Sequence, residues 1–382
     1  MKLLTADRLR AIMANQNPFL PSGELRPADQ RYTFLAANAN FPFEVFAQAL
    51  VAAAGDSPLF LQASRNALHI AGQGIAGNDR QAVFIGARRL RFLVEEFVAH
   101  YQAPAVALAL DHYRLPEFDP TARPEPGQNA AVLHEAIQAC SVVGLDSDYS
   151  HDAYLAYLSG PAYQEAKREL QAVVQILAPA WVMVDTEDLP PVLAFAVARD
   201  MGMALRPGGQ GPMLEAEFGG IGGLAKGGAD QADLSALAAA VTAFVRFSAA
   251  DAVAYDIGME HGAAPRSGHQ PDEERLLTVQ RHLGQELGRY VPFVQHGGTG
   301  AAYLARGLVG KNNINTHFLV TAARALLESI DRRREGIQRG HKYDCSVAIY
   351  RGLMEAVAAA AREKLAETGT LGKAQQILAA VE

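Results

Sequence analysis

The stretch VALALDHY, residues 106–113, joins an apolar segment typical of a buried strand to a polar pair, Asp111 and His112. Other short apolar, β-prone segments recur along the chain, separated by helix-compatible stretches rich in Ala, Leu, Glu and Arg. They cover residues 32–37, 59–63, 141–145, 181–184, 213–218, 252–257, 291–294 and 313–314. Strands that alternate with helices predict a parallel sheet with crossover helices.

About eight such units over roughly 330 residues favour an α/β fold of the (β/α)8 TIM barrel type. The competing architecture is an open doubly wound sheet, but no clear GxGxxG joins a first strand to a helix. With 106–110 the chain has nine candidate strands for eight places. Either the segment that ends at Asp146 or the one that ends at Asp185 therefore lies outside the barrel, and the residues leave open which.

The predicted barrel domain covers residues 1–330, with an insertion within about 113–212. The Pro-rich stretch 115–128 and the stretch 206–212 are expected to be loops. After Ile330 a charged run precedes a predicted helix from about 346 to 367, so residues 331–382 are expected to form a C-terminal helical extension.

Composition limits the possible partners. Lys and Arg total 34 against 41 for Asp and Glu, a net charge of −7, and no dense basic run points to nucleic acid. The apolar stretches are too short to span a bilayer, and the first 16 residues predict an amphipathic helix rather than a signal peptide. The two cysteines lie far apart and fit a reducing compartment, so we expect a cytoplasmic protein.

Three histidines stand at predicted strand ends, where barrel enzymes place their chemistry: His112, His261 and His296. Catalytic zinc commonly takes three protein ligands, so three imidazoles from separate strands predict a metal site. Taken singly, each could be an ordinary polar residue. Asp111 is predicted to act as a general acid or base beside the metal. Consecutive strand residues point to opposite faces, so Asp111 and His112 reach one site only if the chain turns there. The alternative for Asp111 is a structural carboxylate that orients His112 or caps a helix.

Glu215 and Glu217 are two residues apart, which puts both carboxylates on one side of a strand. Glu217 is the candidate for a further metal ligand or for a group that holds one, and buried ion pairing is the alternative. Small residues after His261 and His296 offer backbone N–H groups that suit phosphate, as does the last strand. The candidates are Gly262, Gly297, Gly298, Thr299, Asn313, Asn315 and Thr316.

In this order, the motifs resemble the class II, metal-dependent ketose-bisphosphate aldolases, which include fructose- and tagatose-bisphosphate aldolases. Successive strand motifs of that family are similar to FLAANAN, LFLQASRNA, ALDHY, LEAEFGGIGG, GMEHG, HGGTG and KNNINT. HKYD and EKLAETGTLGKA resemble the C-terminal arm of the family.

The resemblance implies a lyase of carbohydrate metabolism, as in glycolysis, that uses Zn2+ to cleave a phosphorylated ketose reversibly. Fructose 1,6-bisphosphate or a related sugar phosphate would give dihydroxyacetone phosphate and an aldehyde through a zinc-stabilised enediolate. His112, His261 and His296 would bind zinc with Glu217 close by, and Asp111 would move the proton of the hydroxyl at the cleaved bond.

By the same resemblance, the glycines and polar residues named for phosphate would hold the dihydroxyacetone-phosphate part, with Asn38 and Ser64 nearby. The resemblance further implies a monovalent cation, Na+ or K+, near the phosphate, and a homodimer or homotetramer.

Some residues depart from the family pattern. The loop GLAKGGADQADL, residues 223–234, offers only Asp230 and Asp233 as the acid that exchanges the enediolate proton. Arg266 stands where the family has a Lys, and Asn315 and His317 replace acidic residues. Two alternatives therefore stay open: another metal-dependent enolate reaction, such as sugar epimerisation, or a non-catalytic partner subunit.

Overall fold

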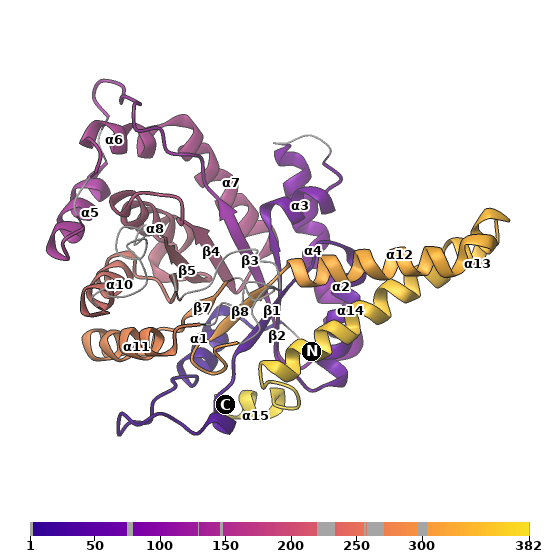
Figure 1. The fold of residues 1–382 in the computed structure, drawn as a ribbon. Helices are drawn as coiled ribbons and strands as arrows, with labels where there is room; N and C mark the ends of the chain where they lie inside the picture. The colour runs from indigo at the N-terminus through magenta and orange to yellow at the C-terminus, as the bar shows by residue number, and fades with distance from the viewer. Residues whose placement is uncertain are drawn as a thin grey trace.

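Eight parallel strands form a nearly closed barrel in the computed structural model (Figure 1). The structure describes residues 3–74, 79–128, 130–145, 148–219, 234–255, 257, 271–296 and 304–381. The strand order is β6-β5-β4-β3-β2-β1-β8-β7, and a parallel bridge between Val253 and Phe293 brings the two edges together. This arrangement confirms the (β/α)8 barrel and excludes the open doubly wound sheet.

The strands are β1 (Phe34–Asn38), β2 (Leu59–Ser64), β3 (Val106–Arg114), β4 (Trp181–Asp185), β5 (Met213–Phe218), β6 (Ala252–Tyr255), β7 (Val294–Gln295) and β8 (Lys311–Ile314). The segment that ends at Asp185 is thus in the barrel. The strand predicted over 141–145 is wrong, because helix α5 (Ala131–Val142) runs into it. Leu133, Ala136 and Cys140 are the buried residues of α5, and their spacing is helical.

The helices of the outer layer are α2 (Pro42–Ala54), α3 (Arg65–Ala71), α4 (Arg80–Tyr101), α8 (Pro191–Leu205), α10 (Leu234–Ser248) and α11 (Glu273–Leu287). Their first turns carry ordinary start signals. Ser64, Asp79 and Asp272 accept hydrogen bonds from backbone N–H groups, and Pro begins α2 and α8. Short 3₁₀ helices lie at Ala28–Gln30 and Pro207–Gly209.

Two apolar cores follow from the alternation of side chains along each strand. In β1, Leu35 and Ala37 face the outer helices, whereas Phe34 and Ala36 belong to the inner core with Phe60 and Trp181. The predicted N-terminal helix is α1 (Ala6–Ala14), and its buried residues Leu9, Ile12 and Met13 join this inner core. Helix α1 therefore covers the end of the barrel where the strands begin.

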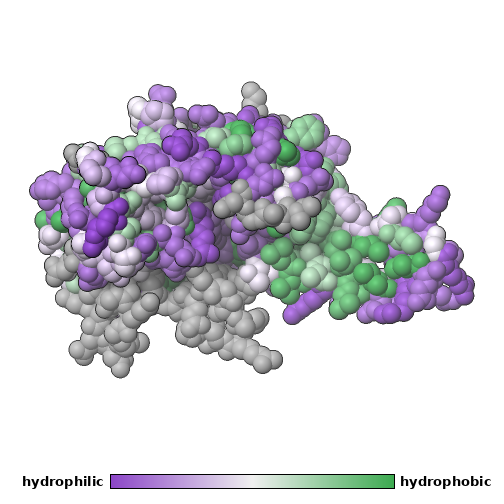
Figure 2. All heavy atoms as spheres, turned by 90° about the horizontal axis from the view of Figure 1, so that it is seen from above, coloured by the Kyte–Doolittle hydropathy of each residue, from purple (hydrophilic) through white to green (hydrophobic). Residues whose placement is uncertain are grey.

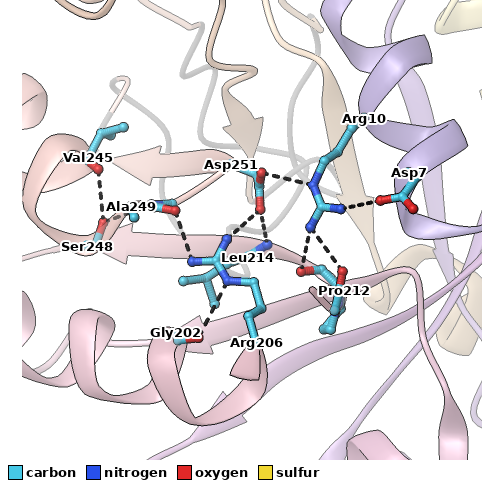
Figure 3. Close-up of polar contacts among 12 residues, drawn as sticks. Asp7, Arg10, Gly202, Arg206, Pro212, Leu214, Val245, Ser248, Ala249 and Asp251 are labelled. Carbon is cyan, nitrogen blue, oxygen red and sulfur yellow. Dashed lines mark hydrogen bonds and ion pairs between the residues drawn. The ribbon is translucent and has the colours of Figure 1, made fainter. Parts of the chain in front are cut away.

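An ion-pair network fixes α1 to that end (Figure 3). Asp251, directly before β6, lies 3.3 Å from Arg10 Nε and 2.9 Å from an Arg206 guanidinium nitrogen, and it accepts the Leu214 N–H at 2.9 Å. Arg10 also donates to the carbonyls of Gly211 and Pro212. These contacts are far from the strand ends that carry the candidate site, and we assign them to stability.

The segment between β3 and β4 adds α5, α6 (His151–Ser159) and α7 (Pro161–Leu177). At the other end of the chain, α12 (Thr316–Gln338), α13 (Lys342–Cys345) and α14 (Val347–Glu367) form a projecting arm, followed by α15 (Ala374–Ala379) (Figure 1). The helix predicted from about 346 to 367 is confirmed as α14. Helix α12 crosses residue 330, and the division into 1–330 and 331–382 stays a prediction.

Hydrophobic side chains gather on this arm between the barrel and a hydrophilic tip (Figure 2). The exposed members are Val320, Leu326, Leu327, Ile330, Tyr343, Val347 and Tyr350. Among the helices that the structure describes, we find none with the length and apolar character needed to cross a membrane.

Candidate active site

A bulge in β3 brings Asp111 and His112 into one site. Leu110 pairs with Val182 and Tyr113 with Val184, so β3 holds one residue more than β4 between these two pairs. Within this bulge, His112 has a left-handed backbone conformation, at φ 35°. That conformation costs a non-glycine residue about 1–2 kcal/mol. The bulge supplies the turn that two consecutive site residues require.

Asp111 is only 3% exposed and is held by two amides. Asn38 Nδ2 donates to one carboxylate oxygen at 2.9 Å, and Asn313 Nδ2 donates to the other at 3.0 Å. Gln62 in turn donates to the side-chain oxygen of Asn38 at 2.7 Å. Residues of β1, β2, β3 and β8 thus fix the plane of this carboxylate.

His112, Glu217 and His296 come together next to Asp111. Each offers a ligand atom, and these atoms lie within 4.8 Å of one another. The imidazole rings of His112 and His296 have centroids 4.7 Å apart. His296 Nδ1 lies 2.8 Å from Glu217, and its Nε2 lies 3.1 Å from Glu215. Metal-bound histidines commonly use their second ring nitrogen on a carboxylate, so this donor set fits a metal such as zinc.

The surroundings of the group raise the pKa values of His296, Glu217 and His112. Burial lowers the pKa of His296, but Glu217 and Glu215 outweigh this effect and raise it well above its usual value. Burial raises the pKa of Glu217 despite the attraction of His296. Burial also opposes the charge of His112, whose pKa is nevertheless raised by Asp111 and Asp185. The site therefore favours positive charge on imidazole, and a bound cation would satisfy the same carboxylates.

Glu215 and Glu217 lie on one side of β5 and both contact His296, but their other partners differ. Glu217 faces the two histidines, whereas Glu215 pairs with Lys311 of β8, and the Nζ to Oε2 distance is 2.7 Å. Trp181 Nε1 also donates to Glu215 at 2.6 Å. Burial would raise the pKa of Glu215, but Lys311 and His296 lower it to about 2. Glu215 thus forms the buried ion pair that we considered for this strand.

Asp185 and Lys311 are site neighbours that sequence reasoning did not select. Asp185 Oδ2 lies 3.5 Å from His112 Nδ1, and Asp185 also belongs to a carboxylate group with Glu187 and Glu217. The signal for Asp185 was its position at the end of an apolar strand segment. Lys311 begins the KNNINT motif, but its contact with Glu215 depends on how the barrel closes.

The structure describes only some of the other residues that were predicted for the site. Ser64 accepts the Ala67 N–H at 3.2 Å and caps α3, and Asn315, whose Oδ1 accepts from Asn40 Nδ2 at 3.1 Å, precedes Thr316 at the start of α12. The remaining candidates lie outside the described residues: His261, Gly262, Gly297, Gly298, Thr299, and the loop acids Asp230 and Asp233.

A cavity of about 720 Å³ opens beside Asp185. Its described lining comes from the end of β3, the loops after β3 and β4, and Gly219 after β5. The charged members are Arg114, Glu117, Asp148, Asp185, Glu187 and Asp188. Carboxylates therefore predominate on the side of the site that lies away from β1 and β8.

These features define a (β/α)8 barrel enzyme whose site combines imidazoles and carboxylates at the carboxyl ends of the strands. The family described as fructose-bisphosphate aldolase class-II matches residues 161–373, more than half of the chain. The chain belongs to this family and is an enzyme of the lyase class. Asp111 and His112 precede the matched range, so their place in the site comes from the structure.

Solved structures share the fold. The fructose-bisphosphate aldolase of Campylobacter jejuni has a TM-score of 0.63 at 18% identity, over 97% of this chain and 96% of that one. The YdjI aldolase of Escherichia coli K12 has a TM-score of 0.59 at 15% identity, over 97% of this chain and 99% of that one. No curated protein matches the chain by sequence.

Proposed function

We propose that this enzyme is a metal-dependent aldolase that reversibly cleaves a phosphorylated ketose to dihydroxyacetone phosphate and an aldehyde. One observation carries the proposal. A buried carboxylate, Asp111, is fixed by two amides beside a group of two imidazoles and one carboxylate that fits a metal. Family membership supplies the reaction class, and this geometry supplies the groups that it needs.

His112 and His296 would hold the metal, with Glu217 as a further ligand or a partner of His296. His261 is proposed as the third imidazole. Zinc bound there would supply Lewis acidity to polarise the ketone of the substrate. To act as a Lewis acid, zinc must be held by several ligands, and the imidazoles and carboxylates at the strand ends would provide them.

Asp111 would take the proton from the hydroxyl at the bond that is cleaved and return it in condensation. The side-chain amides of Asn38 and Asn313 would hold the Asp111 carboxylate in the orientation for that transfer. Asn313, Asn315 and Thr316, together with Gly262, Gly297, Gly298 and Thr299, are proposed to hold the phosphate end, with Na+ or K+ nearby. Asn38 and Ser64 would complete that side, in an enzyme that we place in the cytoplasm.

The proposal is tested by elemental analysis of the purified protein and a coupled assay for dihydroxyacetone phosphate. The assay covers ketose monophosphates and bisphosphates, and the same sugars are examined for epimerised products. Stoichiometric zinc with cleavage of one sugar supports the aldolase. Zinc with epimerisation alone would show another enolate reaction, and a protein without metal would contradict the site.

The acidic cavity beside Asp185 predicts selectivity against a second phosphate. Exposed charge pairs are worth about 0.2–1 kcal/mol each, so several carboxylates should disfavour a distal phosphate by roughly tenfold in kcat/KM. We expect ketose 1-phosphates to be preferred over 1,6-bisphosphates. Lowering the negative charge of the cavity with Asp148→Asn and Asp188→Asn should narrow this ratio, whereas Glu328→Gln on the arm should not. A preference for 1,6-bisphosphates that neither Asp148→Asn nor Asp188→Asn changes would contradict the prediction.

The apolar surface of the arm supports a homodimer or homotetramer. Leu327 is 62% exposed and Val347 is 47% exposed, a cost that burial against another copy would remove. Light scattering is expected to give a dimer or tetramer for the wild type and a smaller mass for Leu327→Glu with Val347→Glu. The substitution Glu328→Gln, next to Leu327 on α12, serves as the control. A monomeric wild type would contradict this proposal.

A further inference from the structure

Tyr113, the residue after His112, is tied to helix α7 by a buried hydrogen bond. Its side chain is 1% exposed, and its hydroxyl donates to Glu169 Oε1 at 2.5 Å. Glu169 lies in α7, within the segment that separates β3 from β4. Helix α7, which packs against α4 and α8, thus contacts the strand residue adjacent to a candidate metal ligand.

Glu169 is itself fixed from two other elements. Arg65, at the start of α3, donates to both of its oxygens at 2.6 and 3.1 Å, and Arg80, at the start of α4, donates to Oε2 at 3.1 Å. Glu169 is only 5% exposed. Hydrogen bonds between charged partners are stronger than neutral ones, so this carboxylate is a rigid acceptor for Tyr113.

Tyr113 also marks the end of the bulge. It is the first residue of β3 that returns to register with β4 after the additional residue. The sheet fixes the start of the bulge at Leu110, and the Glu169 contact adds a second constraint at its far end. His112 lies between these two points in a left-handed conformation that the surroundings must maintain.

We propose that Glu169 and Tyr113 are positioning residues that maintain the β3 bulge and thereby the direction of the His112 imidazole. The proposal rests on the metal site proposed above. It gives helix α7 a part in metal binding although none of its residues belongs to the group of His112, Glu217 and His296. Partners that orient metal ligands commonly affect metal affinity by about 10- to 100-fold.

The chain offers a matched control in a second buried tyrosine, Tyr163, which lies in α7. Tyr163 is 1% exposed, and its hydroxyl donates to Asp200 of α8 at 2.7 Å. Lys167 binds the same carboxylate. Removing the hydroxyl of Tyr163 therefore deletes a similar tyrosine–carboxylate bond, but one that joins two helices and leaves β3 untouched.

The experiment compares Tyr113→Phe, Glu169→Gln and Tyr163→Phe with the wild type. Dissociation constants for Zn2+ and Co2+ are measured by competition with a chelator, and hydrogen exchange of residues 110–114 is followed in metal-free protein. We expect Tyr113→Phe and Glu169→Gln to weaken metal binding by about 10- to 100-fold and to speed this exchange. Tyr163→Phe should stay within about twofold of the wild type, and the double variant Tyr113→Phe with Glu169→Gln should be no weaker than the weaker single variant.

Equal metal affinity in Tyr113→Phe and the wild type would overturn the inference, as would an equal loss in Tyr113→Phe and Tyr163→Phe. The second result would show a general effect of stability. A wild-type protein that binds neither metal would overturn the proposed metal site and this inference with it. If the wild type binds metal and Tyr113→Phe binds it equally well, the inference is overturned but the proposed metal site is not.

Discussion

Asp111→Asn is expected to lower the aldol cleavage rate by about 10²- to 10⁴-fold while the metal content stays at the wild-type level. An amide cannot take the proton of the substrate hydroxyl, so the loss should appear in kcat more than in KM. The change keeps the volume of the side chain. It is measured by steady-state kinetics on the substrate that the sugar panel identifies.

The surroundings of Asp111 can accept this substitution. Asn38 and Asn313 both present NH2 groups to the carboxylate, so an amide at position 111 would face one of them with its own NH2 group. Asn313 Oδ1 is buried and has no hydrogen-bond partner within the described residues. A flip of the Asn313 amide would therefore satisfy the new NH2 group, and the fold should be retained.

Metal content and the thermal unfolding midpoint of Asp111→Asn are the controls. If both match the wild type and the rate is lost, Asp111 is the proton carrier. A variant that keeps near-normal turnover would exclude that role and favour a structural carboxylate that orients His112.

Lys311→Met is expected to lower the free energy of unfolding by about 3–5 kcal/mol. Lys311 and Glu215 are both fully buried, and their ion pair joins β8 to β5 through the inside of the barrel. Without the ammonium group, Glu215 would keep a buried negative charge whose other hydrogen-bond partners among the described residues are Trp181 and His296. Urea denaturation of metal-free protein measures the loss.

The control is the double variant Lys311→Met with Glu215→Gln. The amide removes the uncompensated charge and retains an acceptor for Trp181 Nε1, which now donates at 2.6 Å. We expect most of the lost stability to return. A Lys311→Met protein that loses less than about 1 kcal/mol would show that the pair contributes little to holding the barrel together.

Much of the barrel was predictable because the signals are local. Each strand required only a short apolar run followed by a polar or Gly-containing end, and such runs were found for β1 to β8. The error at 141–145 has a local cause as well. A short apolar run cannot be assigned to a strand or to a helix end by periodicity, and here the spacing of Leu133, Ala136 and Cys140 decided for the helix.

The candidate site was predictable in its residue types but not in its arrangement. Asp111, His112, Glu217 and His296 could be selected because each stands at or near a strand end. The contact between Asp185 and His112 could not, because it joins residues 73 positions apart on neighbouring strands. The different partners of Glu215 and Glu217 likewise depended on where Lys311 lies.

By itself, the sequence determined the alternation of strands and helices, and with it the barrel and the end of the barrel that carries polar groups. Side-chain alternation and parallel strand direction are consequences of backbone geometry, so they can be read from short segments. Only the tertiary structure decided the bulge at His112, the Lys311–Glu215 pair and the anchoring of Tyr113 by Glu169. Each of these depends on groups from distant segments, whose distances and burial are set when the barrel closes.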